Sequence, residues 1–356
     1  MTSAGEDKEL KEFWGAPILD LEGLRNPEHR KIEEHYRKST IITPEGRFQV
    51  RIPFRDVNKK DIAKNAGRAL AMFRRLEETM KKDSNLAREY HKAMAKDFIN
   101  GHLREVEYDE VKAFIPHHGV WKDSTSTKLR MVMNFSASEP NKMSVNEACM
   151  SGPTIQKPLL ATLIQFSTGR YATSGDVTQM YKQVQVHPKD QLWQCFPWRS
   201  KENDRIRYYA YKVLTFGHAS SAYMAIRTLL EIADREAANF PIGTSFIKDN
   251  MYVDDLEISM NDPKMLLTGL IQTREALKKY KFVMTKWKSN IPEIVEALGG
   301  DQQPTTVLGM KWNPKTDEMG FVWHPQPVGD VTMRKYLSDV QQLFDPLGLL
   351  SPVTIR

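Results

Sequence analysis

The segment Tyr252-Val253-Asp254-Asp255 places the strongest constraint on what this chain can fold into. Two adjacent aspartates follow an apolar, β-prone stretch, SFIKDNMY, and precede Leu256-Glu257-Ile258. Side chains on an extended strand alternate between its faces, so neighbouring carboxylates converge only where the chain turns. The segment therefore predicts two strands that meet at a tight acidic turn. A divalent cation such as Mg²⁺, which prefers hard carboxylate oxygens, would relieve the repulsion there. Taken alone, an Asp-Asp pair is more typical of a solvated turn.

A third aspartate changes the interpretation of that turn. Asp176 stands at the end of YATSGDV, where a strand is predicted to give way to TQMYKQV. A lone aspartate at such a place is usually a turn or cap residue. Together with a distant Asp-Asp hairpin, it fits a two-metal phosphoryl-transfer site, in which the metals lie about 3.5–4 Å apart. Lys128 and Arg130 begin the predicted strand KLRMVMNF on one face under i, i+2 alternation, although such a pair is also typical of an exposed edge.

The rest of the chain predicts an α+β protein with more than one subdomain. Helical segments alternate with short, mostly non-crossover strands over 356 residues. Two cysteines supply neither a disulfide framework nor a zinc-ligand spacing, and no apolar run approaches the roughly 18 residues that span a bilayer. The charged N-terminus has no secretory apolar region. We therefore expect a protein of a reducing compartment without a membrane partner.

Basic residues are concentrated between residues 58 and 100, a stretch that predicts two helices broken near Asp83-Ser84-Asn85. From residue 59 to residue 82 there are eight Lys or Arg and three Asp or Glu, a local excess of +5. The whole chain has a formal net charge of 51 − 45 = +6. The bland interpretation is a solvated helix face, and the sharper one is a contact surface for a nucleic-acid backbone. The residues proposed for that contact are Lys59, Lys60, Lys64, Arg68, Arg74 and Arg75.

With these segments in place, the sequence resembles the reverse transcriptase region of BEL/Pao-type LTR retrotransposon polyproteins. The resemblance runs from about residue 10 to residue 356. It rests on an ordered set of motifs: GRFQVRIPF, IPHHGVWK, STSTKLRMVMNFSAS, GDVTQMYKQVQV, FGHASSAYMA, YVDDL, TKWKSN, VLGMKWNP and LFDPLGLLSPVTIR. The tetrapeptide YVDD alone is moderately specific, whereas the ordered set is highly specific.

The resemblance implies a right-hand polymerase with a helical N-terminal extension over residues 1–55. Fingers would span 56–155, with 182–213 returning to them. The palm, including the primer-grip region, would span 156–181 and 214–324. Residues 325–356 would begin a truncated thumb or connection. The implied activity is RNA-directed DNA polymerase, acting with a dNTP on an RNA or DNA template-primer.

The resemblance also implies roles for individual residues. Asp176, Asp254 and Asp255 match the catalytic aspartates that hold two Mg²⁺ ions, with Mn²⁺ as an alternative. The expected nucleotide-binding residues are Lys128, Arg130, Tyr181, Phe216, Gly217 and Lys286, and Lys122 is a further candidate. Tyr181 matches the aromatic residue that stacks under the deoxyribose and excludes a 2′-hydroxyl, and Lys286 matches a lysine that neutralises the leaving pyrophosphate. Leu308, Gly309 and Met310 match the primer grip. Without the family pattern, Tyr181 is more typical of a core residue, Lys286 of a plain surface lysine, and residues 308–310 of a buried strand.

Departures from the family pattern leave a second hypothesis open. Asn134 stands where an aspartate is usual, and Ala222 stands where a proline is common. The chain stops where the family continues into RNase H and integrase domains, which we expect only in a parent polyprotein. The alternative is a catalytically silent, domesticated or decayed nucleic-acid-binding remnant. A third option, a metal-dependent nuclease built on the same carboxylates, is less well supported, because the sequence has no further acidic or histidine ligands near the motifs. The family implies a cytoplasmic location, in element particles.

Overall fold

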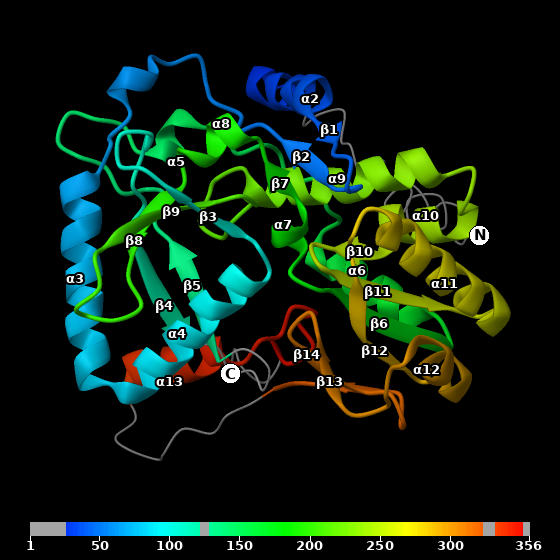
Figure 1. Ribbon diagram of the computed structural model, residues 1–356. Coiled ribbons are helices and arrows are strands. Elements are labelled where there is room, and N and C mark those ends of the chain that lie inside the picture. The colour runs from blue at the N-terminus through cyan, green and yellow to red at the C-terminus, as the bar shows by residue number, and fades with distance from the viewer. Residues whose placement is uncertain (1–25, 122–127, 323–331, 352–356) are drawn as a thin grey trace. The chain divides into compact units, whose positions relative to one another are not determined.

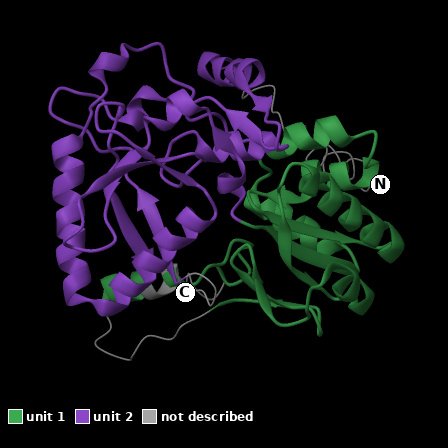
Figure 2. Ribbon diagram, viewed as in Figure 1, with its two compact units in different colours: residues 1–18, 156–178, 229–356 green, residues 19–155, 179–228 purple. Residues whose placement is uncertain are grey.

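The computed structural model describes residues 26–121, 128–322 and 332–351 (Figure 1). The chain divides into two compact units (Figure 2). Unit 1 contains residues 1–18, 156–178 and 229–356, and unit 2 contains residues 19–155 and 179–228. Each unit therefore gathers segments that lie far apart in the sequence. The predicted finger, palm and thumb boundaries stay a prediction.

Unit 1 is built on an antiparallel sheet with the strand order β10-β11-β6-β12. Its central strand β11 buries three consecutive side chains, because helices α6, α10 and α11 pack against it. The elements are α6 (Leu159–Thr168), β6 (Tyr171–Val177), α10 (Pro241–Asn250), β10 (Met251–Tyr252), β11 (Asp255–Met260), α11 (Pro263–Lys279), β12 (Met284–Ser289) and α12 (Pro292–Leu298).

A smaller sheet of unit 1, in the order β13-β14-β15, packs on α6 through apolar side chains. Phe166 of α6 meets Trp312 of β14 edge to face, with ring centroids 5.1 Å apart. This contact ties the small sheet to the helix that also covers β11. The remaining elements are β13 (Thr305–Val307), β14 (Met310–Asn313), β15 (Glu318–Gly320) and α13 (Met333–Gln342).

Unit 2 contains three small sheets, in the orders β1-β2-β7, β3-β9-β8 and β4-β5. Its aromatic core joins Phe73, Tyr90, His117 and Trp198, with ring centroids 5.7–6.2 Å apart. The elements are α2 (Pro27–Ser39), β1 (Ile41–Ile42), β2 (Phe48–Val50), the 3₁₀ turn η2 (Lys59–Asp61), α3 (Ala66–Lys82), α4 (Ser84–Ile99), β3 (Leu103–Val106), β4 (His117–Trp121), β5 (Leu129–Met133), α5 (Val145–Ala148), α7 (Met180–Gln183), β7 (Gln185–Val186), α8 (Pro188–Gln191), β8 (Cys195–Trp198) and β9 (Arg207–Tyr211). Helix α9 (Ser221–Glu236) runs from unit 2 into unit 1.

The predicted α+β class is confirmed, as is the break between two helices near residue 83. Asp83 ends α3 and caps α4, because its carboxylate accepts hydrogen bonds from the amides of Asn85 and Leu86. One strand prediction is wrong, since residues 245–250 belong to helix α10. Within the described parts of the chain, no helix is long and apolar enough to cross a membrane.

Candidate active site

The acidic turn of unit 1 joins strands β10 and β11. Tyr252 pairs with Asp255, so Val253 and Asp254 form a two-residue turn. Val253 has a φ of 58°. A β-branched residue rarely adopts positive φ, and two-residue hairpins normally place glycine at such a position. The structure therefore confirms the predicted turn and shows strained backbone within it.

Asp176 and Asp255 face each other across the two central strands of this sheet. They are direct partners in the β6–β11 register. The amide of Val177 donates to the carbonyl of Asp254 at 2.7 Å, which extends the ladder into the turn. Directly opposite side chains leave a sheet on the same face with Cβ atoms about 4.5–5.5 Å apart. The fold thus places two of the three predicted catalytic carboxylates side by side, 79 positions apart in the sequence, with the third at the adjoining turn.

Lys286 approaches this site from the other side of β6. Its ammonium lies 3.1 Å from Oδ2 of Asp176, and its side chain is 62% exposed. The residue has a φ of 57° and stands where the β12–β6 register shifts. Such a bulge re-aims a side chain next to a functional site. It brings the predicted leaving-group lysine into contact with a predicted metal ligand.

The donor set suits a hard divalent cation. Asp176 and Asp255 supply carboxylate oxygens on one face, and Mg²⁺ is typically bound through one or two carboxylates together with substrate phosphates. Among the residues described, no group of three or more acidic, histidine or cysteine side chains is already gathered as a metal site. The Lys286 ammonium partly neutralises Asp176 in this arrangement. The residues therefore fit a metal that binds together with its phosphate ligand.

Sequence analysis missed a buried carboxyl group in the same strand. Glu257 lies two residues after Asp255 and is 1% exposed. Burial, together with the charge of Asp255, raises the pKa of Glu257 well above its usual range, although the Ser174 hydroxyl opposes this by donating to Oε1 at 3.1 Å. The i, i+2 alternation of β11 could have placed it on the face of Asp255.

Three of the predicted nucleotide-binding side chains lie in contact in unit 2. The Arg130 guanidinium lies 4.5 Å from the centroid of the Phe216 ring, and the Tyr181 ring lies 4.9 Å from the same ring. Leu129 is buried between exposed Lys128 and Arg130, so the predicted alternation is correct. The structure thus joins Arg130, Phe216 and Tyr181 into one column, although only a family pattern related them in the sequence. Lys122 lies outside the described residues.

Gly217 has a second reason to be glycine. Its φ is 97°, and a Cβ atom there would lie 2.0 Å from the carbonyl oxygen of Met133. The Gly217 carbonyl also accepts a hydrogen bond from Asn146 at 3.0 Å. Close packing against the end of β5 therefore requires glycine at this turn, whether or not a nucleotide approaches it.

The predicted primer grip is a hairpin turn in unit 1. Leu308 and Gly309, with φ values of 46° and 92°, connect β13 to β14, and Met310 begins β14. Two successive positive φ values are typical of a type I′ turn. Val307 and Met310 anchor the hairpin in the core. The turn supports the predicted hairpin over a plain buried strand.

The six basic residues proposed to contact a nucleic-acid backbone do not all lie on one helix. Lys59 and Lys60 belong to η2, and α3 begins only at Ala66. The Lys64 ammonium lies 4.3 Å from the Tyr108 ring centroid. The Arg68 guanidinium donates to the Ser138 carbonyl at 2.8 Å. The predicted continuous helix from residue 58 is therefore wrong, and the exposed pair Arg74 and Arg75 is the clearest basic surface that α3 presents.

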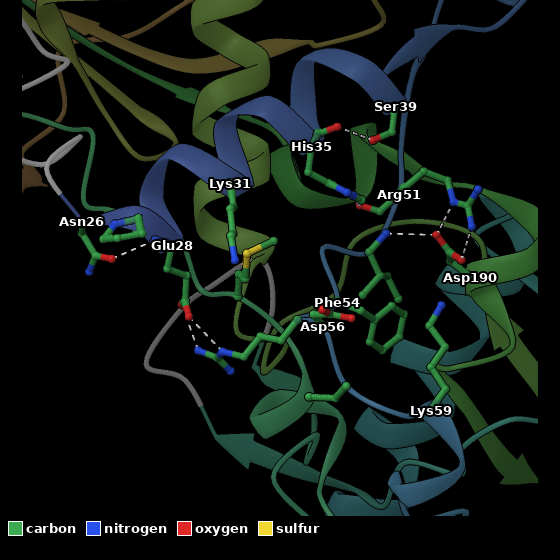
Figure 3. Close-up of a pocket in the computed structure, with 15 residues that line it drawn as sticks. Asn26, Glu28, Lys31, His35, Ser39, Arg51, Phe54, Asp56, Lys59 and Asp190 are labelled. Atoms are coloured by element: carbon green, nitrogen blue, oxygen red, sulfur yellow. Dashed lines mark hydrogen bonds and ion pairs between the residues drawn. The ribbon is translucent and has the colours of Figure 1, made fainter.

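A cavity of about 1020 Å³ opens in unit 2 between α2 and residues 51–59 (Figure 3). Its arginines are bound to carboxylates. Arg51 contacts Asp190 at 2.6 and 2.9 Å, and Arg55 contacts Glu28 twice at 2.9 Å. Both arginines are thus paired, whereas Lys31 and Lys59 add cationic side chains to the wall of the cavity.

Comparison with known proteins gives two findings. A family model described as "Reverse transcriptase (RNA-dependent DNA polymerase)" matches residues 115–312, more than half of the chain. This range contains the acidic turn, the Arg130 column and the β13–β14 hairpin. Among solved structures, a foamy viral protease-reverse transcriptase in complex with double-stranded DNA is similar at 16% identity and a TM-score of 0.40. The match covers 57% of this chain and 31% of that one. No curated protein sequence matches.

Proposed function

We propose that this chain, which belongs to the reverse transcriptase (RNA-dependent DNA polymerase) family, is an RNA-directed DNA polymerase that extends a primer with dNTPs on an RNA or DNA template. The observation that carries the proposal is the pairing of Asp176 with Asp255 beside a strained acidic turn. Opposed carboxylates repel each other, and strained backbone persists where function requires it. Both features suit a site that gathers cations around phosphates.

In the proposed reaction, Asp176, Asp254 and Asp255 would hold two Mg²⁺ ions, with Mn²⁺ as an alternative. Such ions, when bound, supply the charge that favours attack by the primer 3′-hydroxyl and release of pyrophosphate. The 3′-hydroxyl gives up its proton to water, a bond forms between the primer 3′-oxygen and the α-phosphorus, and the bond from the α-phosphorus to the α–β bridging oxygen breaks. The Nζ atom of Lys286 would exchange its contact with Asp176 for the pyrophosphate oxygens, where it neutralises or protonates them.

The nucleotide would be recognised by the residues of unit 2. Arg130 and Lys128 would contact the triphosphate, since exposed cations on one strand face suit phosphate oxygens. Tyr181 would be the steric gate, meaning the side chain whose bulk excludes a 2′-hydroxyl, and Phe216 supports its ring at 4.9 Å. Gly217 would keep this turn close to the backbone of β5.

Template and primer would be held by separate surfaces. The β13–β14 hairpin at Leu308, Gly309 and Met310 would contact the primer end. Exposed Arg74 and Arg75 would contact template phosphates without sequence preference. Affinity should then fall steeply as salt rises from about 50 to 200 mM, because bound phosphates release counterions. A flat salt response would contradict this part of the proposal.

We also infer a more specific origin and setting. The ordered motifs support a BEL/Pao-type LTR retrotransposon polyprotein, in which RNase H and integrase domains would accompany this polymerase region. Such a polymerase would act in the cytoplasm, inside element particles.

The test measures dNTP incorporation on poly(rA) primed with oligo(dT) in the presence of Mg²⁺. The parent chain should extend the primer, and the double variant Asp254→Asn, Asp255→Asn should not. The exposed turn residue Asp109 provides the matched control, and Asp109→Asn should extend normally. If the parent binds template in a salt-dependent way but never extends it, a retired, nucleic-acid-binding polymerase is the better description.

A further inference from the structure

A largely buried group of charges in unit 2 includes Lys182, the residue that follows the proposed steric gate Tyr181. The carboxylate of Asp97, at the end of α4, is 3% exposed and bound by three side chains. The Lys182 ammonium contacts it, the Tyr211 hydroxyl donates to it at 2.8 Å, and His102 Nδ1 lies 3.2 Å away. Burial raises the pKa of Asp97, but these partners together hold it below its usual value.

Helix α7 contacts this group through Lys182. The helix is a single turn of four residues, and Gln179 enters it with a φ of 51°. One helical turn does not stabilise itself, so contacts outside the turn must fix it. At its C-terminal end the Val184 carbonyl accepts a hydrogen bond from the Leu214 amide at 3.0 Å, and Met180 is buried in the core. The partly buried Lys182–Asp97 ion pair adds a charged contact that ties α7 to α4.

Tyr181 precedes Lys182 in the same turn of helix. Its ring lies on Phe216, whose ring in turn lies under the Arg130 guanidinium. Any rotation or shift of α7 would therefore move the Tyr181 ring relative to this column. A displacement of about 1 Å in a positioning element can cost on the order of a hundredfold in kcat/KM.

We propose that Asp97 and Lys182 are positioning residues that hold Tyr181 in the orientation needed to select deoxyribonucleotides. The inference rests on the proposed function. It assigns a specificity role to a partly buried ion pair whose two residues lie 85 positions apart in the sequence and touch no substrate themselves.

A purely structural role predicts a different result from a positioning role. Loss of a buried pair lowers stability in both cases. Only the positioning role also changes the preference for dNTP over rNTP and the KM for dNTP while leaving kcat nearly unchanged in the folded protein.

The experiment compares single-nucleotide incorporation of dNTPs and rNTPs by the parent, Lys182→Met, Lys182→Arg, Asp97→Asn and Tyr181→Val. Methionine keeps the stem of Lys182 but removes its charge. We expect Lys182→Met and Asp97→Asn to raise the KM for dNTP roughly ten- to a hundredfold and to lose selectivity as Tyr181→Val does. Lys182→Arg should recover most of the selectivity. The exposed Lys189 is the control, and Lys189→Met should match the parent.

The outcomes separate this inference from the proposed function. If Tyr181→Val loses selectivity while Lys182→Met retains it, the inference is overturned and the polymerase function stands. If the parent incorporates no nucleotide, the proposed function fails. Amide hydrogen exchange then provides a readout without activity, because Lys182→Met should accelerate exchange at residues 182–184. Unchanged exchange there would overturn the inference.

Discussion

Replacing Gly217 by alanine should destabilise unit 2 for two separable reasons. The left-handed φ of 97° costs an L-residue about 1–2 kcal/mol. The new Cβ would also lie 2.0 Å from the Met133 carbonyl oxygen, so the turn or the end of β5 must shift. Overpacking of this kind costs about 1–3 kcal/mol. We therefore expect Gly217→Ala to lower the free energy of unfolding by about 2–5 kcal/mol.

Comparison with two other glycines in a urea-unfolding assay separates the cost of the positive φ from the cost of the steric clash. Gly299 has a φ of 71° but open space around its Cβ position, so Gly299→Ala should cost only about 1 kcal/mol. Gly67, near the start of α3, has ordinary φ and open space, so Gly67→Ala should stabilise by about 0.5 kcal/mol. Equal costs for Gly217→Ala and Gly299→Ala would refute the close approach to Met133.

Two further predictions concern buried charge in unit 2. Burial lowers the pKa of His117 to about 4, so the unfolded chain takes up a proton first as pH falls below about 6.5. The contribution of His117 to the free energy of unfolding is complete above that pH and is lost toward pH 4 at about 1.4 kcal/mol per pH unit. Urea unfolding at pH 7, 6 and 5 will measure this slope, and His117→Gln should remove it. Arg227→Met would remove hydrogen bonds of 3.0–3.1 Å from the Glu33 carboxylate and leave it with Arg37 and Tyr223, each at 2.6 Å. We expect a loss of about 1–3 kcal/mol that Glu33→Leu in the same chain partly restores, and no recovery in the double variant would contradict a desolvation cost.

Local signals explain why much of the candidate site could be predicted. The turn at Asp254 follows from alternation, and the start of α11 follows from Asp262, whose carboxylate accepts hydrogen bonds from the amides of Lys264 and Met265. The opposition of Asp176 and Asp255 required the strand register, which only the folded sheet supplies. The network of Asp97 could not be predicted, because its partners come from three separate segments.

Helix α10 shows why a β-prone segment can fold as a helix. The SFIKDN stretch reads as apolar and extended, yet Pro241 begins a helix there. The Gln272 side chain of α11 accepts hydrogen bonds from the amides of Ile242 and Gly243 at 2.9 and 3.0 Å. These caps come from a segment thirty residues away, so tertiary contact overrides the local β propensity.

The distribution of strained backbone favours a working polymerase over a retired one. Among the described residues, eight that are not glycine have positive φ, and Asn65, Asn141 and Asp317 belong to types that tolerate it. Four of the other five lie in or beside predicted site residues: Gln179 before Tyr181, Val253 before Asp254, Lys286 itself and Leu308 in the primer grip. Each such residue costs about 1–3 kcal/mol, and substitution would readily relieve it if only stability mattered. Strain concentrated at the predicted site positions is what we expect where function, rather than the fold alone, constrains these residues.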